Sequence, residues 1–151
     1  MTTRLTLPIA ALGALAAAPL VLGPSSGGAA AQEGGRPYTV QMTGAAEVPG
    51  PGDPDGSGTA TFRVNAGQNR VCYTLTVEDI EPATAAHIHR TPPDPGPPVV
   101  TLDPPTDGSS EGCAEVTRAL AQELIRDPGI FYVNVHNAEY PGGAVRGQLS
   151  R

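Results

Sequence analysis

The stretch VCYTLTV at residues 71–77 indicates the fold most clearly, because large apolar side chains occupy every second position. Successive side chains of a β-strand point to opposite faces, so a period of two is typical of a strand with one buried face. The same alternation occurs over residues 38–43 and 59–65. Shorter strand-like segments lie at residues 85–90, 99–102, 112–116, 130–137 and 144–149. The chain is therefore expected to consist mainly of short strands.

Turn-forming residues separate these segments. The chain has 19 Gly and 17 Pro, which are concentrated in loops such as residues 48–58, 91–98 and 103–111. Thr117 is expected to cap a helix over residues 118–126, which Asp127-Pro128-Gly129 would end. Closely spaced strands with turns between them predict an all-β fold, an antiparallel Greek-key sandwich or barrel of about seven or eight short strands. The short helix would lie in a connection.

Composition limits the possible functions. A chain of 151 residues has room for one small domain, which excludes a large two-domain catalytic machine. All nine basic residues are Arg, 15 residues are acidic, and the net charge is −6. This balance excludes a typical nucleic-acid-binding protein, which needs a basic surface for the phosphates.

The N-terminus has the pattern of an export signal. A positive start at residues 1–4 precedes an uncharged apolar run, and Ala29-Ala30-Ala31 fits the small-residue cleavage pattern. We therefore expect a signal peptide at residues 1–31, a flexible leader at 32–37 and one domain at 38–151, in a secreted or cell-envelope protein. An uncleaved membrane anchor is the alternative. A second hydrophobic run is missing from the sequence, so no membrane span is expected in the mature chain.

The two cysteines agree with export. Cys72 and Cys113 both lie in strand-like segments, and an even number of cysteines is typical of an oxidising compartment. A Cys72–Cys113 disulfide would close a loop of about 42 residues and stabilise the fold by about 4 kcal/mol. Two buried free thiols are the alternative.

The three histidines carry the sharpest functional hypothesis. His87 and His89 are two residues apart in one strand, so both imidazoles leave the same face. His136 shares a strand face with Tyr132 and Asn134. If the two strands are close, three imidazoles could converge on one ion, and three His ligands suit copper or zinc. The alternative is a structural polar network of these histidines with Asn134 and Arg146.

Four motifs resemble the CHRD (chordin-type) domain family: AAHIH at 85–89, GPPVVTL at 96–102, YVNVHN at 132–137 and PGGAVRGQL at 141–149. The match extends to EVP at 47–49 and GTATF at 58–62. The resemblance implies a small extracellular β-sandwich. The single domain and the absence of Lys are typical of a bacterial member, so the growth-factor regulation associated with chordin is not carried over.

A weaker resemblance concerns the order of the histidine motifs, which is similar to that in the copper half of Cu/Zn superoxide dismutases. It implies that His87, His89 and His136 are copper ligands and that Arg146 guides anions. The chain departs from that family because it has no bridging His and no zinc subsite.

These observations favour a non-enzymatic exported module that binds an extracellular protein, a surface polymer or a metal ion. A copper-dependent redox protein using His87, His89 and His136 is the alternative, and a structural envelope protein is the second alternative.

Overall fold

Eight strands and one α-helix make up the computed structural model, which describes residue 1 and residues 34–151. Apart from residue 1, the expected signal peptide and the first residues of the leader lie outside the described residues. The strands are β1 (Arg36–Thr43), β2 (Ser57–Asn65), β3 (Arg70–Glu78), β4 (Ala83–Arg90), β5 (Pro98–Leu102), β6 (Ser109–Glu115), β7 (Phe131–Asn137) and β8 (Val145–Gln148). Helix α1 spans Arg118–Arg126, and short 3-10 turns lie at Gly44–Ala46 and Pro128–Ile130.

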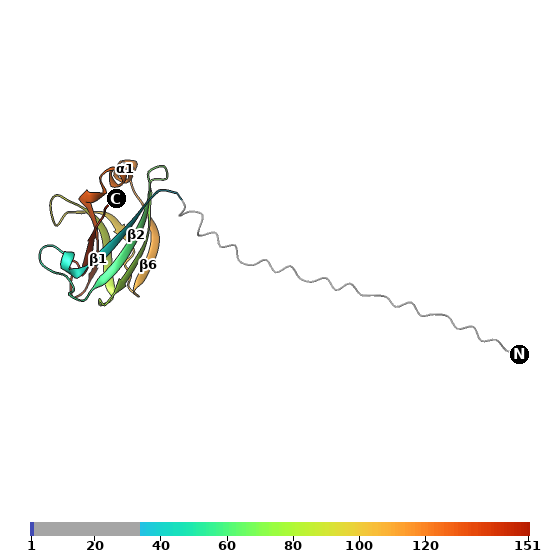
Figure 1. Cartoon of the computed structure of the whole chain (residues 1–151), viewed down its shortest axis with the longest axis horizontal. Coiled ribbons are helices and arrows are strands. Elements are labelled where there is room, and N and C mark those ends of the chain that lie inside the picture. Colours follow the sequence, from blue (N-terminus) through green and yellow to red (C-terminus); the bar gives the residue numbers. More distant parts are fainter. Residues whose placement is uncertain (2–33) are drawn as a thin grey trace.

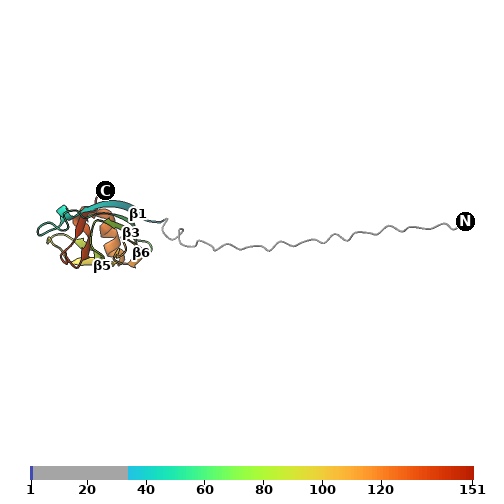
Figure 2. The ribbon, with the colours of Figure 1, turned by 90° about the horizontal axis from the view of Figure 1, so that it is seen from below.

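The strands form one antiparallel sheet in the order β5-β4-β7-β8-β1-β2-β3-β6. The sheet curls until its two end strands, β5 and β6, approach each other, which gives a nearly closed barrel (Figure 1). Figure 2, turned by 90°, shows β1 and β5 on opposite sides of the interior. The all-β prediction is therefore confirmed, with the barrel as its form.

Side chains rather than a strand ladder close the seam between β5 and β6. Tyr73 in β3 donates from its hydroxyl to Asp103 Oδ2 at 3.0 Å and accepts from the Asp103 backbone N–H at 2.8 Å. Ser110 in β6 donates to the Asp103 carbonyl at 2.7 Å. Asp103 directly follows β5, so these bonds hold that edge against β3 and β6.

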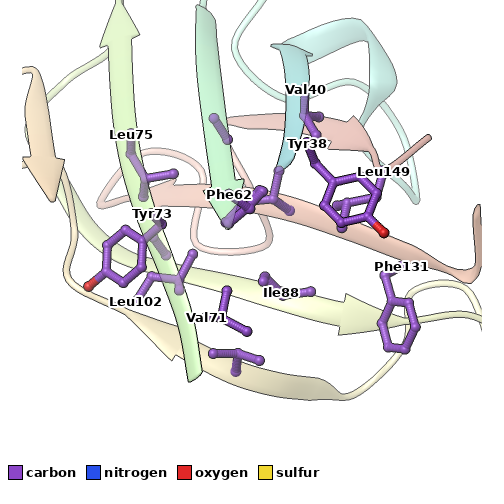
Figure 3. Packing of buried hydrophobic residues seen from close by; sticks show 14 of the residues in the cluster. Tyr38, Val40, Phe62, Val71, Tyr73, Leu75, Ile88, Leu102, Phe131 and Leu149 are labelled. Atoms are coloured by element: carbon purple, nitrogen blue, oxygen red, sulfur yellow. The ribbon is translucent and has the colours of Figure 1, made fainter. Parts of the chain in front are cut away.

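The interior of the barrel is filled by the alternating apolar residues of the strands (Figure 3). Phe62, Val71 and Ile88 are each at most 1% exposed. Burying an aliphatic or aromatic side chain of this size contributes about 1.5–3 kcal/mol. The period of two in the sequence is thus explained by an interior that only every second side chain reaches.

Helix α1 has the predicted bounds and lies across one end of the barrel (Figure 1). The Thr117 hydroxyl accepts a hydrogen bond from the Leu120 N–H at 3.1 Å, as expected of an N-cap residue. Leu124 is fully buried, and the Tyr38 hydroxyl of β1 donates to its carbonyl at 3.0 Å. The helix therefore covers the core at this end.

Strand β6 begins at Ser109, whereas the sequence predicted a loop up to residue 111. Its first residues, Ser-Ser-Glu, have no apolar alternation, so no periodic signal marks them as a strand. They pair with β3 nevertheless, with Ser109 opposite Thr76 and Glu111 opposite Thr74. Here β6 is extended by its backbone pairing with β3, whose alternation of apolar residues is regular.

Cys72 and Cys113 lie directly opposite each other on β3 and β6. Their sulfur atoms are 2.08 Å apart, at disulfide distance. Such a bond would attach the end strand β6 covalently to its neighbour.

Within residues 34–151, helices long and apolar enough to cross a bilayer are absent.

Candidate metal centre

The outer face of strands β4, β7 and β8 carries the three histidines. In the register of these strands, His87 is opposite Asn134, His89 is opposite Tyr132, and Asn134 is opposite Arg146. The intervening residues of β4 and β7, such as Ile88 and Val133, point into the core. The alternation of the strands therefore gathers the polar side chains on the outside of the barrel.

The three imidazoles converge, as the spacing of the motifs indicated. One ring nitrogen from each of His87, His89 and His136 lies within 4.8 Å of the other two. The closest pair is His87 Nδ1 and His136 Nε2, which are 3.2 Å apart. His87 and His89 come from one strand and His136 from the neighbouring one, so the rigid β4–β7 ladder sets their spacing.

Backbone carbonyls orient two of the rings. His89 Nδ1 is 2.8 Å from the Gly96 carbonyl, and His136 Nδ1 is 3.1 Å from the Pro141 carbonyl. A carbonyl oxygen only accepts, so each Nδ1 carries the hydrogen and the lone pair of each neutral ring is on Nε2. His89 Nε2 is buried and has no hydrogen-bond partner among the described residues.

The surroundings of His87 and His136 favour the neutral form of these two imidazoles. Burial lowers the pKa of His87, and the nearby His136 and His89 lower it further. Burial also lowers the pKa of His136, an effect that the bond to the Pro141 carbonyl opposes. Neutral imidazole is the form that binds a metal ion. At pH 7 the imidazoles of His87 and His136 are mainly in this form, so an ion would not have to displace the proton of an imidazolium.

The arrangement fits a copper or zinc ion. With metal–nitrogen bonds of about 2.0–2.1 Å, ligand nitrogens around one ion are about 3.3–3.5 Å apart. The His87–His136 pair, at 3.2 Å, is slightly closer than this. Because His136 Nε2 has the lone pair, His87 Nδ1 donates the hydrogen in this contact, and His87 must change tautomer or turn its ring to become a ligand. A separation of 4.8 Å, the upper limit in the cluster, would have to shorten by rotation of the side chains. Three imidazoles are a donor set that suits copper or zinc better than calcium or magnesium.

Arg146 lies beside the histidines but does not face them. Tyr132 stacks on His89, with ring centroids 4.8 Å apart and planes at 5°. On the β8 side, the Arg146 guanidinium carbon lies 3.5 Å from the centroid of the same Tyr132 ring. The guanidinium donates to both carboxylate oxygens of Asp94, at 2.8 and 3.1 Å. Its charge is therefore paired, and its contact with the imidazoles runs through Tyr132.

A second polar group, Glu47, is buried next to this face. It follows the 3-10 turn after β1, is 7% exposed, and packs against Gly143, where a Cβ would collide with its carboxyl group. Burial raises the pKa of Glu47 from 4.5 to about 7, and the Arg146 charge offsets only part of this effect. Glu47 Oε1 and Asn134 Oδ1 are both buried without a hydrogen-bond partner in the described part of the chain.

Sequence reasoning named the three histidines, Asn134 and Arg146 but not the groups that the loops bring to them. Asp94 and Gly96 lie in the Pro-rich segment predicted to be a loop at residues 91–98, and Gly96 and Glu47 appeared only within family motifs. Asp94 and Arg146 are 52 residues apart, and no short-range pattern relates them. The only available signal was composition, since Asp94 is the one charged residue within the stretch PPDPGPP.

The comparisons with known proteins agree with the motifs. The model of the CHRD domain family matches residues 38–149. Neither a curated protein nor a solved structure gave a match to the chain.

Proposed function

Because the chain belongs to the CHRD domain family, we propose that it is an exported, non-enzymatic binding module that holds a copper or zinc ion through His87, His89 and His136. The family supports a small binding module. The bound metal ion, the export of the chain and its extracellular partner go beyond the family and are proposed here.

The observation that carries the proposal is the arrangement of ligand atoms before any ion binds. Three ring nitrogens meet within 4.8 Å, and two of the rings are fixed by bonds from Nδ1 to backbone carbonyls. Metal-binding histidines usually have such a second hydrogen bond, which fixes the tautomer and orients the ring. A purely structural polar network would be expected to satisfy the buried His89 Nε2, which has no partner among residues 34–151.

Two observations support export. The chain begins with the pattern of a signal peptide, and the Cys72 and Cys113 sulfurs are at disulfide distance, which is typical of proteins outside the reducing cytoplasm. On this basis the protein is secreted or held in the cell envelope. Its partner would be an extracellular protein or a surface polymer that contacts the loops of the rigid barrel.

The test is metal analysis and calorimetry on protein purified without a His-tag. We expect one equivalent of copper or zinc per chain, and we expect His136→Ala to lose it. Thr101→Ala is the matched control, because Thr101 is exposed and lies opposite His87 on β5 without contributing a ligand. The proposal is refuted if the wild-type protein retains no metal and its melting temperature is unchanged by added copper or zinc.

The alternative, a copper-dependent redox protein, would use the same ligands. His87 and His136 are only partly buried, so a bound ion would have a side open to solvent. Electron paramagnetic resonance distinguishes the two functions: a redox protein must bind copper in both oxidation states and cycle between them with an added reductant. If the protein retains copper in only one of its two oxidation states, the result favours the binding module.

A further inference from the structure

The Pro-rich loop between β4 and β5, residues 91–97, contacts His89, which is the least exposed of the three histidines in the candidate metal centre. We propose that this loop, fixed by the Asp94–Arg146 ion pair, is a latch that holds His89 in its metal-binding orientation. Asp94, Gly96 and Arg146 are thus positioning residues. This inference rests on the proposed metal binding, and its test is chosen so that the two can fail separately.

The Gly96 residue is held on both sides. Its carbonyl accepts from His89 Nδ1 at 2.8 Å, and its N–H donates to the Tyr132 hydroxyl at 3.1 Å. A Cβ at this position would collide with the Arg90 carbonyl oxygen, so the close approach requires glycine. Since Tyr132 also stacks on His89, one residue of the loop and one ring of β7 fix both the tautomer and the plane of this ligand.

Besides the bond from the Gly96 N–H to the Tyr132 hydroxyl, the loop is anchored to the barrel at three places. The Arg90 N–H donates to the Pro97 carbonyl at 3.3 Å, and the Thr91 N–H donates to the Ile130 carbonyl at 2.7 Å. These bonds hold only the ends of the loop. Its middle is attached by Asp94, which bridges to Arg146 with two hydrogen bonds.

The ion pair is well suited to this role. The Arg146 side chain is 6% exposed, lies on β8 and rests on Tyr132, so it offers a rigid partner of fixed geometry. A bidentate pair of this type adds directional precision as well as attraction. Removing the Asp94 carboxylate would leave the buried Arg146 with Glu47 as its nearby carboxyl, a group whose pKa burial raises to about 7, and the loop would lose its central anchor.

The consequence for the site is a loss of preorganisation. Without the Asp94–Arg146 pair, the Gly96 carbonyl would be kept beside His89 only by the Gly96–Tyr132 bond and the Pro97 end of the loop, and the ring would gain freedom to rotate and to exchange its tautomer. Loss of such an outer-shell partner typically weakens metal binding by about 10- to 100-fold. Asp94→Asn should therefore weaken copper or zinc binding by about this factor, although Asp94 itself contacts no ligand atom.

The experiment compares the full chain with Asp94→Asn and with Asp94→Glu, which keeps the charge and should recover part of the affinity. Glu123→Gln is the matched control, since it also removes one carboxylate from an ion pair, that with Arg90 at the end of β4, while it leaves the Asp94–Arg146 pair intact. Calorimetric titration with copper and with zinc gives the dissociation constants. Melting temperatures show that each variant is folded.

A second readout needs no metal. Long-range ¹H–¹⁵N correlation spectra of the metal-free protein report which nitrogen of His89 carries the hydrogen. The wild type should show the single Nδ1–H tautomer, Glu123→Gln should keep it, and Asp94→Asn should show a mixture. If Asp94→Asn keeps both the tautomer and the affinity of the wild type, the latch is refuted while metal binding stands. If the wild type binds no metal, the proposed function is refuted, and the tautomer alone decides whether Asp94 positions His89.

Discussion

Replacing Glu47 by Gln tests how the buried polar groups around the site affect stability. In the folded chain, burial raises the pKa of this carboxyl from 4.5 to about 7. The folded protein therefore holds the proton more tightly than the unfolded chain does. Between these two pKa values the folded state binds more protons, so raising the pH favours unfolding over that interval.

The size of the effect follows from the shift. One pKa unit corresponds to about 1.4 kcal/mol, and with an allowance for screening by solvent we expect a loss of about 2–3 kcal/mol from pH 4.5 to above pH 7. A Gln side chain does not titrate and can donate to a buried acceptor such as Asn134 Oδ1, so the variant should escape this loss. The stability of Glu47→Gln relative to the wild type should rise by the same amount over this interval.

The assay is urea unfolding of both proteins between pH 5 and pH 8, in the presence of a chelator so that metal binding does not contribute. The three histidines are present in both proteins, so their contribution to the pH dependence cancels when the free energies of unfolding are subtracted. Glu139→Gln is the control, because Glu139 is an exposed carboxyl near the same turn. A stability difference between Glu47→Gln and the wild type that stays constant across the pH range would show that the Glu47 carboxyl is not held protonated by its burial.

Three further predictions concern the metal, the cysteines and the core. Metal affinity should fall as the pH is lowered, and protonation of His87 and His136 should contribute to this fall only below the ordinary histidine range, because their pKa values are lowered; titrations from pH 5 to 7.5 test this. The Cys72→Ser/Cys113→Ser double variant should lose about 4 kcal/mol of unfolding free energy and should be insensitive to a reducing agent, and an unchanged melting temperature would contradict the bond. Phe62→Ala should cost about 3–5 kcal/mol by chemical unfolding, because the side chain is 1% exposed and its removal leaves a cavity.

The strands and the convergence of the histidines could be predicted from the sequence because both depend on short-range periodicity. The period of two places His87 and His89 on one face, and it places His136 on the face opposite Val133 and Val135. That β4 and β7 are neighbours was only a condition of the sequence hypothesis, and the register with Asn134 opposite His87 meets it. The bounds of α1 were predictable because its cap and its stop are local signals.

The contacts from the loops were not predictable because they join distant parts of the chain. The period of two places Tyr132 and Asn134 on one strand face with His136, but it did not indicate that both would be buried, as they are in the structure. Proline and glycine give the loop a shape, but no periodic pattern indicates which strand it will touch. Glu47 shows the same limit, since its burial depends on a turn almost 100 residues later that contains Gly143.

The seam between β5 and β6 has a consequence for colloidal behaviour. The free edge of a β-sheet presents unpaired amide and carbonyl groups, and these can recruit a strand from another molecule and begin fibril growth. Here each terminal strand faces the other, and Asp103 with its partners Tyr73 and Ser110 occupies the gap. A barrel sealed in this way offers little template for edge-to-edge assembly, so we expect concentrated solutions of the folded protein to resist amyloid formation.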